Sequence, residues 1–267
     1  GISYNVIGLR WFFLLWAIFV AVFNCLGAFL FPPAKKRKPI NEKQSVRSTN
    51  EDVNTQSKIE KLYHWTTWRK WSYWVLFYSF ACVTGCGLFV INNISTMVQS
   101  LGGQDSLAGF LVILLSLCNC FGRIVVGIAA DKGQLSKMNL FRIAALVMAA
   151  ALLLSATAGP NTSLIRLVIT IAFVAMAYGS NWVLIVQILS EKFGREHFGK
   201  DYGVIALGPA LSSLIFNSAS ARIYEDHIDT GDSSICIGTT CYHTSFLFTA
   251  FAAVSGIILS FFIGRGR

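Results

Sequence analysis

Long apolar stretches separated by short polar segments dominate the chain. Seven of them contain no Asp, Glu, Lys or Arg: Trp11–Phe31, Trp71–Gln104, Ser106–Gly122, Ile143–Ile165, Leu167–Ser190, Tyr202–Ala221 and Tyr242–Gly264. About 20 apolar residues are needed to cross the hydrocarbon core of a bilayer as a helix. The third stretch reaches that length only by continuing through Arg123 to Ala130. The pattern therefore predicts seven transmembrane helices, since the continuous runs lack the ten-residue alternation of barrel strands.

Composition supports this interpretation. Hydrophobic residues make up 54% of the chain and charged residues 13%, and the mean hydropathy is +0.58. Soluble domains carry about 25% charged residues. The sequence thus predicts an all-α, polytopic integral membrane protein surrounded by the lipid bilayer. The net charge is +9, but the segment Ala34–Lys70 alone holds ten Lys/Arg and four Asp/Glu. Because the basic character is local, we expect no nucleic-acid partner.

The charge pattern divides the chain into three parts. Residues 1–33 form one helix ended by Pro32-Pro33, residues 34–70 a basic, largely disordered linker, and residues 71–267 a six-helix half-domain. The linker opens with a basic cluster that is typical of a topology signal, with binding of anionic lipid as the alternative. It ends with a tryptophan at every third position, which favours an interfacial belt over ligand stacking: Trp65, Trp68, Trp71 and Trp74.

Lysine and arginine alternate between the two sides of the predicted helices. They are frequent in the linker, in the loops Asp131–Arg142 and Glu191–Asp201, and at the C-terminus, and sparse in Arg222–Cys241. By the positive-inside rule the basic segments are cytoplasmic, in either a plasma membrane or an endomembrane. The chain begins with Gly1, and six helices after a long linker and one helix are typical of the second half of a twelve-helix secondary transporter. We therefore expect a missing N-terminal half of the same protein as a partner.

The strongest local pattern lies at the end of the third predicted helix, where Gly122, Arg123, Gly127, Asp131 and Lys132 follow one another closely. An arginine within the membrane is costly unless it pairs or snorkels, so Arg123 calls for a partner such as Asp131 or a helix C-terminus. Gly122 and Gly127 would let another helix approach closely. The alternative is simple snorkelling of Arg123 together with a topology signal.

This pattern resembles the cytoplasmic loop motif of the major facilitator superfamily, in which a glycine precedes an acid, a base and a glycine-containing turn. The matching residues are Gly127, Asp131, Lys132 and Gly133. The resemblance implies a conformational latch formed by Arg123, Asp131 and Lys132. Further segments are similar to the nodulin-like subfamily over about Trp71 to Arg265: Gly85–Gly87, Asn92-Asn93, Ser100–Gly102, Tyr178–Trp182, Ser190–Gly194, His197–Gly199 and Cys236–Phe246. This resemblance implies a secondary transporter that moves a small molecule or ion by alternating access. Relatives often carry an acid at the position of Asn92 and an arginine at that of His243.

Several amides fall inside the predicted helices, where they must find partners or line a wet cavity. We expect Asn92, Asn93, Tyr178 and Asn181 to line the substrate pathway, with bonding to a neighbouring helix as the alternative for Asn181. Gly208 and Pro209 mark a helix that the proline should kink, because Pro209 leaves a carbonyl unpaired. They are candidates for a gating hinge, and a proline tolerated without motion is the alternative.

Cys236 and Cys241 fall together in the predicted exterior loop, where oxidising conditions favour a disulfide. Free thiols, or a site shared with His227, are the alternatives. The sequence has no zinc spacing and none of the common phosphate-binding or hydrolase motifs. We expect no metal, no cofactor and no enzymatic activity. A transporter-derived receptor that binds a ligand without flux is the alternative function, and a membrane enzyme ranks third.

Overall fold

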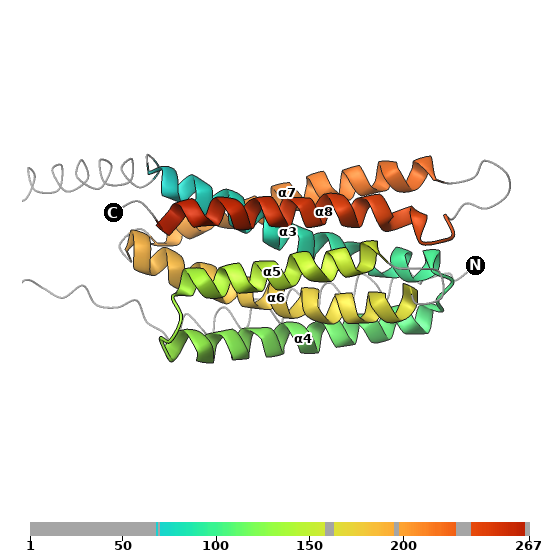
Figure 1. The fold of residues 1–267 in the computed structure, drawn as a ribbon, viewed down its shortest axis with the longest axis horizontal. Coiled ribbons are helices and arrows are strands. Elements are labelled where there is room, and N and C mark those ends of the chain that lie inside the picture. The colour runs from blue at the N-terminus through green and yellow to red at the C-terminus, as the bar shows by residue number, and fades with distance from the viewer. Residues whose placement is uncertain (1–67, 69, 158–162, 195–197, 228–235, 265–267) are drawn as a thin grey trace, which may run out of the picture. The chain divides into compact units, whose positions relative to one another are not determined.

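The computed structural model describes residues 68, 70–157, 163–194, 198–227 and 236–264 (Figure 1). The chain divides into two compact units, Gly1–Ser57 and Lys58–Arg267, and every described residue belongs to the second. The predicted first helix, at residues 1–33, and nearly all of the predicted linker lie outside the described residues.

Six long helices make up the described part of the chain. They are α3 (Trp71–Ser100), α4 (Asp105–Asp131), α5 (Lys137–Ala156), α6 (Ser163–Phe193), α7 (Phe198–Asp226) and α8 (Thr240–Ser260), followed by the short 3-10 helix η1 (Phe261–Gly264). All six are long and apolar enough to cross a membrane. The predicted all-α, polytopic membrane fold is therefore confirmed over this part.

The predicted boundary between the fourth and fifth apolar runs was wrong. Helix α5 ends at Ala156 and α6 begins at Ser163, so Arg166 lies in the first turn of α6 and does not separate two helices. A single charge is compatible with a helix, whereas the Gly159-Pro160 pair between the two helices is not. The Arg166 guanidinium donates a hydrogen bond to the carbonyl of Thr157, where a cation offsets the unpaired carbonyls at the end of α5.

The helices form two groups of three, with α3, α7 and α8 on one side and α4, α5 and α6 on the other (Figure 1). Helix α3 packs on α7 and α8, α4 packs on α6, and α5 joins the groups by packing on both α6 and α8. The most apolar window of α3 is 72% buried, against 33% in α7 and 22% in α4. Because α4 and α7 remain apolar where they are exposed, lipid or another part of the protein must cover them.

Polar contacts bring the basic loops together at one end of the bundle. Lys137 at the start of α5 pairs with Glu191 near the end of α6 at 3.0 Å. The Tyr73 hydroxyl, in the first turn of α3, donates to the carbonyl of Asp201 in α7. This end therefore gathers the Lys- and Arg-rich loops that the charge pattern groups together. Their location in the cytoplasm stays a prediction.

Candidate functional site

Helices α4 and α6 cross in very close contact, and two glycines make this crossing possible. A Cβ atom on Gly122 would lie 2.3 Å from the carbonyl oxygen of Met176, and one on Gly179 would lie 2.3 Å from that of Asn119. The Ser180 hydroxyl donates across the crossing to the carbonyl of Gly122 at 3.1 Å. The close helix approach expected at Gly122 is present here.

Arg123 lies beside this crossing, on α4. Its Nε donates to the Asn119 side-chain oxygen at 3.1 Å. Asn119 also lies at the crossing, where its backbone carbonyl would meet a Cβ on Gly179. Arg123 is exposed on the six-helix unit, although eight residues, or about 12 Å of helix, separate it from the end of α4 at Asp131. The structure thus places an accessible cation within the depth of a membrane-spanning helix.

The remaining residues of the predicted latch lie at the end of α4. A Cβ on Gly127 would have nothing within 4 Å among the described atoms, so the close helix approach expected there is not made in this unit. Asp131 ends the helix, and Gly133 continues the turn with a φ of +66°. The pairing of Arg123 with Asp131 or with a helix C-terminus stays a prediction. In this structure the guanidinium is bonded by Asn119, one helical turn before Arg123.

Tyr178 and Asn181 come together on α6 but differ in access. Tyr178 is half-buried and lies close to α3, where a Cβ on Gly87 would lie 2.5 Å from its ring. Asn181 is completely buried, and neither its amide nitrogen nor its oxygen has a hydrogen-bond partner among the described residues. Asn181 is therefore enclosed within the bundle, whereas part of Tyr178 is accessible.

The two asparagines on α3 also have different surroundings. Asn92 is exposed, whereas the Asn93 amide donates to the Asn217 side-chain oxygen of α7 at 2.6 Å and to the carbonyl of Phe89 at 2.8 Å. Asn217 in turn donates to Ser213. Asn93 is thus part of an interhelical bond between α3 and α7, which leaves Asn92 as the accessible amide of the pair.

Gly208 and Pro209 lie in the first half of α7, which continues without a break from Phe198 to Asp226. A Cβ on Gly208 would lie 2.9 Å from the Cβ of Ala81, so α3 and α7 are close at this height. One turn later the Ser212 hydroxyl donates to the carbonyl of Ala81 at 2.6 Å. The contact shows close packing at this proline, and the hinge stays a proposal.

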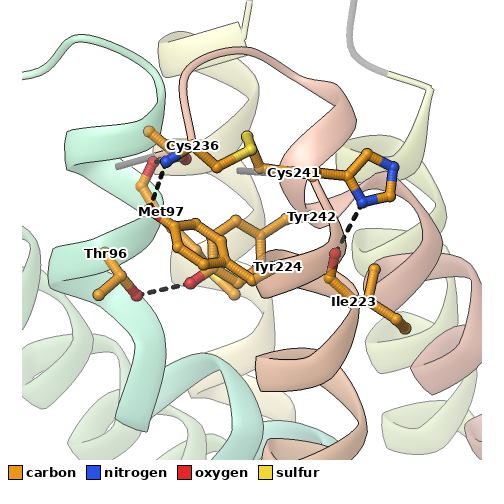
Figure 2. Close-up of a disulfide and its surroundings, with 9 residues drawn as sticks. Thr96, Met97, Ile223, Tyr224, Cys236, Cys241 and Tyr242 are labelled. Carbon is orange, nitrogen blue, oxygen red and sulfur yellow. Dashed lines mark hydrogen bonds between the residues drawn. A yellow bond between two sulfur atoms is a disulfide. The ribbon is translucent and has the colours of Figure 1, made fainter. Parts of the chain in front are cut away.

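A disulfide joins Cys236 and Cys241 at the end of the bundle away from the start of α3 (Figure 2). The amide of Cys236 donates to the Tyr224 hydroxyl of α7 at 3.1 Å. The Tyr242 hydroxyl of α8 forms a hydrogen bond with Thr96 of α3 at 2.6 Å, and the Tyr224 and Tyr242 rings lie 5.5 Å apart. The bridge therefore lies on a polar and aromatic cluster that connects α3, α7 and α8.

Three residues form contacts that the sequence analysis did not predict, although Asn119 is one of the amides within the predicted helices. Asn119 precedes Arg123 by four residues, and this spacing was a usable signal because such side chains meet on a helix. Arg142 donates to both the hydroxyl and the carbonyl of Ser260 and so binds the end of α8. Asp201 is 2% exposed and accepts a hydrogen bond from the Trp68 indole at 3.2 Å. No local spacing predicts the last two contacts, which join distant segments.

The described residues contain no group of three or more His, Cys, Asp or Glu that could hold a metal ion. The indole groups of Trp71 and Trp74 are 74% and 44% exposed at the start of α3, as an interfacial location requires. The Trp74 indole also donates to the carbonyl of Trp68 at 2.7 Å.

Comparison with known proteins gives a consistent result. The family model described as Major Facilitator Superfamily matches residues 1–217. The chain is 29% identical over 212 residues to the uncharacterized MFS-type transporter YhjX of Escherichia coli, which covers 79% of this chain and 48% of that protein. It is 27% identical to the Arabidopsis thaliana protein NUCLEAR FUSION DEFECTIVE 4, in a match that covers 70% of this chain and 33% of that protein. It is also 27% identical to the probable transporter mch1 of Aspergillus fumigatus, in a match that covers 63% of this chain and 34% of that protein. The plant and fungal relatives fit the nodulin-like subfamily, and the chain spans about a third to a half of these relatives' lengths.

Proposed function

Because the chain belongs to the Major Facilitator Superfamily, we propose that it is the second half of a secondary transporter that moves a small solute by alternating access. In this proposal the N-terminal half of the same protein covers the exposed faces of α4 and α7, and the solute crosses between the halves. The Lys- and Arg-rich end of the bundle lies in the cytoplasm.

The observation that carries the proposal is Arg123, an accessible guanidinium within a membrane-spanning helix. It is held by a neutral amide, Asn119, one turn before it on α4. A cation at this depth is costly unless an anion or water accompanies it, and such residues usually mark the path of a substrate or ion. We therefore assign to Arg123 the binding of a small anionic solute, in which the planar guanidinium bonds a carboxylate or similar group through two donors.

The other candidate residues take different roles in this proposal. Asn92 and Tyr178 line the pathway with Arg123, since they are accessible or half-buried. Asn93 and Asn181 act inside the bundle and reach the pathway only if the helices rearrange. Gly127, Asp131 and Lys132 form the latch at the end of α4, where they would engage helices of the other half. Gly208 and Pro209 supply the hinge in α7.

The proposal is tested by solute flux with full-length protein in sealed vesicles. Small organic anions are compared with sugars, amino acids and metal ions, with and without a proton gradient. We expect saturable flux of an anion, whose KM rises about 10- to 100-fold in Arg123→Gln because charged hydrogen bonds are lost. Arg222→Gln is the matched control, because Arg222 is an exposed arginine near the other end of the bundle.

The latch is tested separately. Asp131→Asn should slow transport with an unchanged KM, because Asp131 affects the conformational step and not solute binding. Full transport by this variant would refute the latch. Binding of the anion without flux would contradict the transporter and favour a receptor. Flux of neutral solutes only, unchanged in Arg123→Gln, would contradict the role of Arg123.

A further inference from the structure

A lateral groove of about 490 Å³ opens between α7 and α8, with α3 as its floor. Its walls are mostly apolar and include Phe77, Leu211, Ile215, Phe248 and Phe251. None of the residues that line it is charged. All three helices are membrane-spanning candidates, so a bilayer lipid can reach this groove wherever the N-terminal half leaves this side of α7 uncovered.

Polar side chains occur at one end of the groove, where the Tyr78 hydroxyl lies 3.2 Å from the hydroxyl of Ser255. Ser255 donates its own hydrogen to the carbonyl of Ala252 at 2.7 Å. Either hydroxyl can be the donor in this bond. A phenolic oxygen keeps acceptor capacity in both cases, so the Tyr78 oxygen can accept a hydrogen bond at the groove, which Cys82 also lines.

The position of this polar end in the membrane follows from the length of helix before it. Tyr78 lies seven residues after Trp71, which corresponds to about 10 Å of helix. The exposed indoles of Trp71 and Trp74 mark the membrane interface on that side. Tyr78 therefore lies nearer to that interface than Phe248, which is two turns before Ser255 along α8.

We propose that this groove binds a membrane lipid whose polar head is a single hydroxyl, of the sterol class. The lipid hydroxyl donates to the Tyr78 oxygen near the interface, and its apolar body packs against the phenylalanine side chains deeper in the bilayer. A phospholipid fits less well, because its phosphate needs cationic or multiple strong donors and the groove lining offers none. The volume lies in the usual range of ligand pockets, about 300–1,000 Å³.

The test uses full-length protein in phosphatidylcholine nanodiscs with a photoreactive sterol, followed by mapping of the labelled peptides. We expect labelling of α3, α7 and α8 at the groove. Tyr78→Phe, which removes the acceptor and keeps the ring, should weaken labelling about three- to tenfold. Ala252→Trp, which fills the groove, should abolish it. Leu117→Trp on the exposed face of α4 is the matched control and should label as the unmodified protein does.

A second set of probes distinguishes the sources of the lipid. A photoreactive sterol methyl ether lacks the hydroxyl hydrogen, so it cannot donate to Tyr78. It should label the unmodified protein weakly, to the same extent as the sterol labels the Tyr78→Phe variant. Equal labelling by the ether, or by phosphatidylcholine with a photoreactive acyl chain, would overturn the proposal. Uniform labelling of all lipid-exposed helices, or unchanged labelling of Tyr78→Phe, would do so too. Monodisperse elution of each variant in size-exclusion chromatography shows that the variant is folded.

Discussion

Replacement of Gly122 by alanine should separate two helices that the structure holds in backbone contact. The new Cβ would lie 2.3 Å from the Met176 carbonyl oxygen and 2.8 Å from its Cα, so no side-chain rotation relieves the clash. To reach an ordinary contact of about 3.4 Å, α4 and α6 must move apart by about 1 Å. Overpacking of this kind costs about 1–3 kcal/mol, and the bond from Ser180 to Gly122 is stretched as well.

Gly109 provides the matched control on the same helix. An added Cβ there has nothing within 4 Å, so Gly109→Ala should leave the free energy of unfolding unchanged or raise it by about 0.5–1 kcal/mol through helix propensity. Thermal unfolding of both variants, as full-length protein in one detergent and followed by tryptophan fluorescence, gives the difference. We expect Gly122→Ala to be less stable by about 2 kcal/mol or more. Equal stability of the two variants would refute the α4–α6 crossing.

Three further changes have definite expected outcomes. Asn181→Leu should raise the free energy of unfolding by about 1–3 kcal/mol and slow transport, because it removes a buried amide that has no partner among the described residues. A loss of stability would show that the Asn181 amide is hydrogen-bonded. Cys236→Ser should lower the stability by about 2 kcal/mol, since the bridge closes a short loop, and reducing agent should then have no further effect on its melting temperature. Arg142→Ala should cost about 2 kcal/mol by freeing the end of α8, with Arg142→Lys intermediate; equal melting of both variants and the parent would contradict this role.

Sequence pattern alone was sufficient for the fold class and for the approximate positions of six helices. The reason is physical. The bilayer core offers no water, so the backbone N–H and C=O groups of a spanning segment must form their hydrogen bonds within that segment, and a long apolar run therefore folds as a helix. The same logic failed at Arg166, where a charge was taken as a helix boundary although Arg166 lies within α6, which begins at Ser163. Family membership likewise followed from short motifs that have fixed spacing along the chain.

The tertiary structure decided which residues meet. Asn93 and Asn217 are 124 positions apart, and the partner of Gly122 is a backbone carbonyl on another helix. A period of 3.6 residues specifies one face of a helix but not the register between two helices, which is set by side-chain volume at each crossing. For this reason the sequence identified Arg123 as a costly cation, and only the packed helices showed that it is exposed beside the α4–α6 crossing.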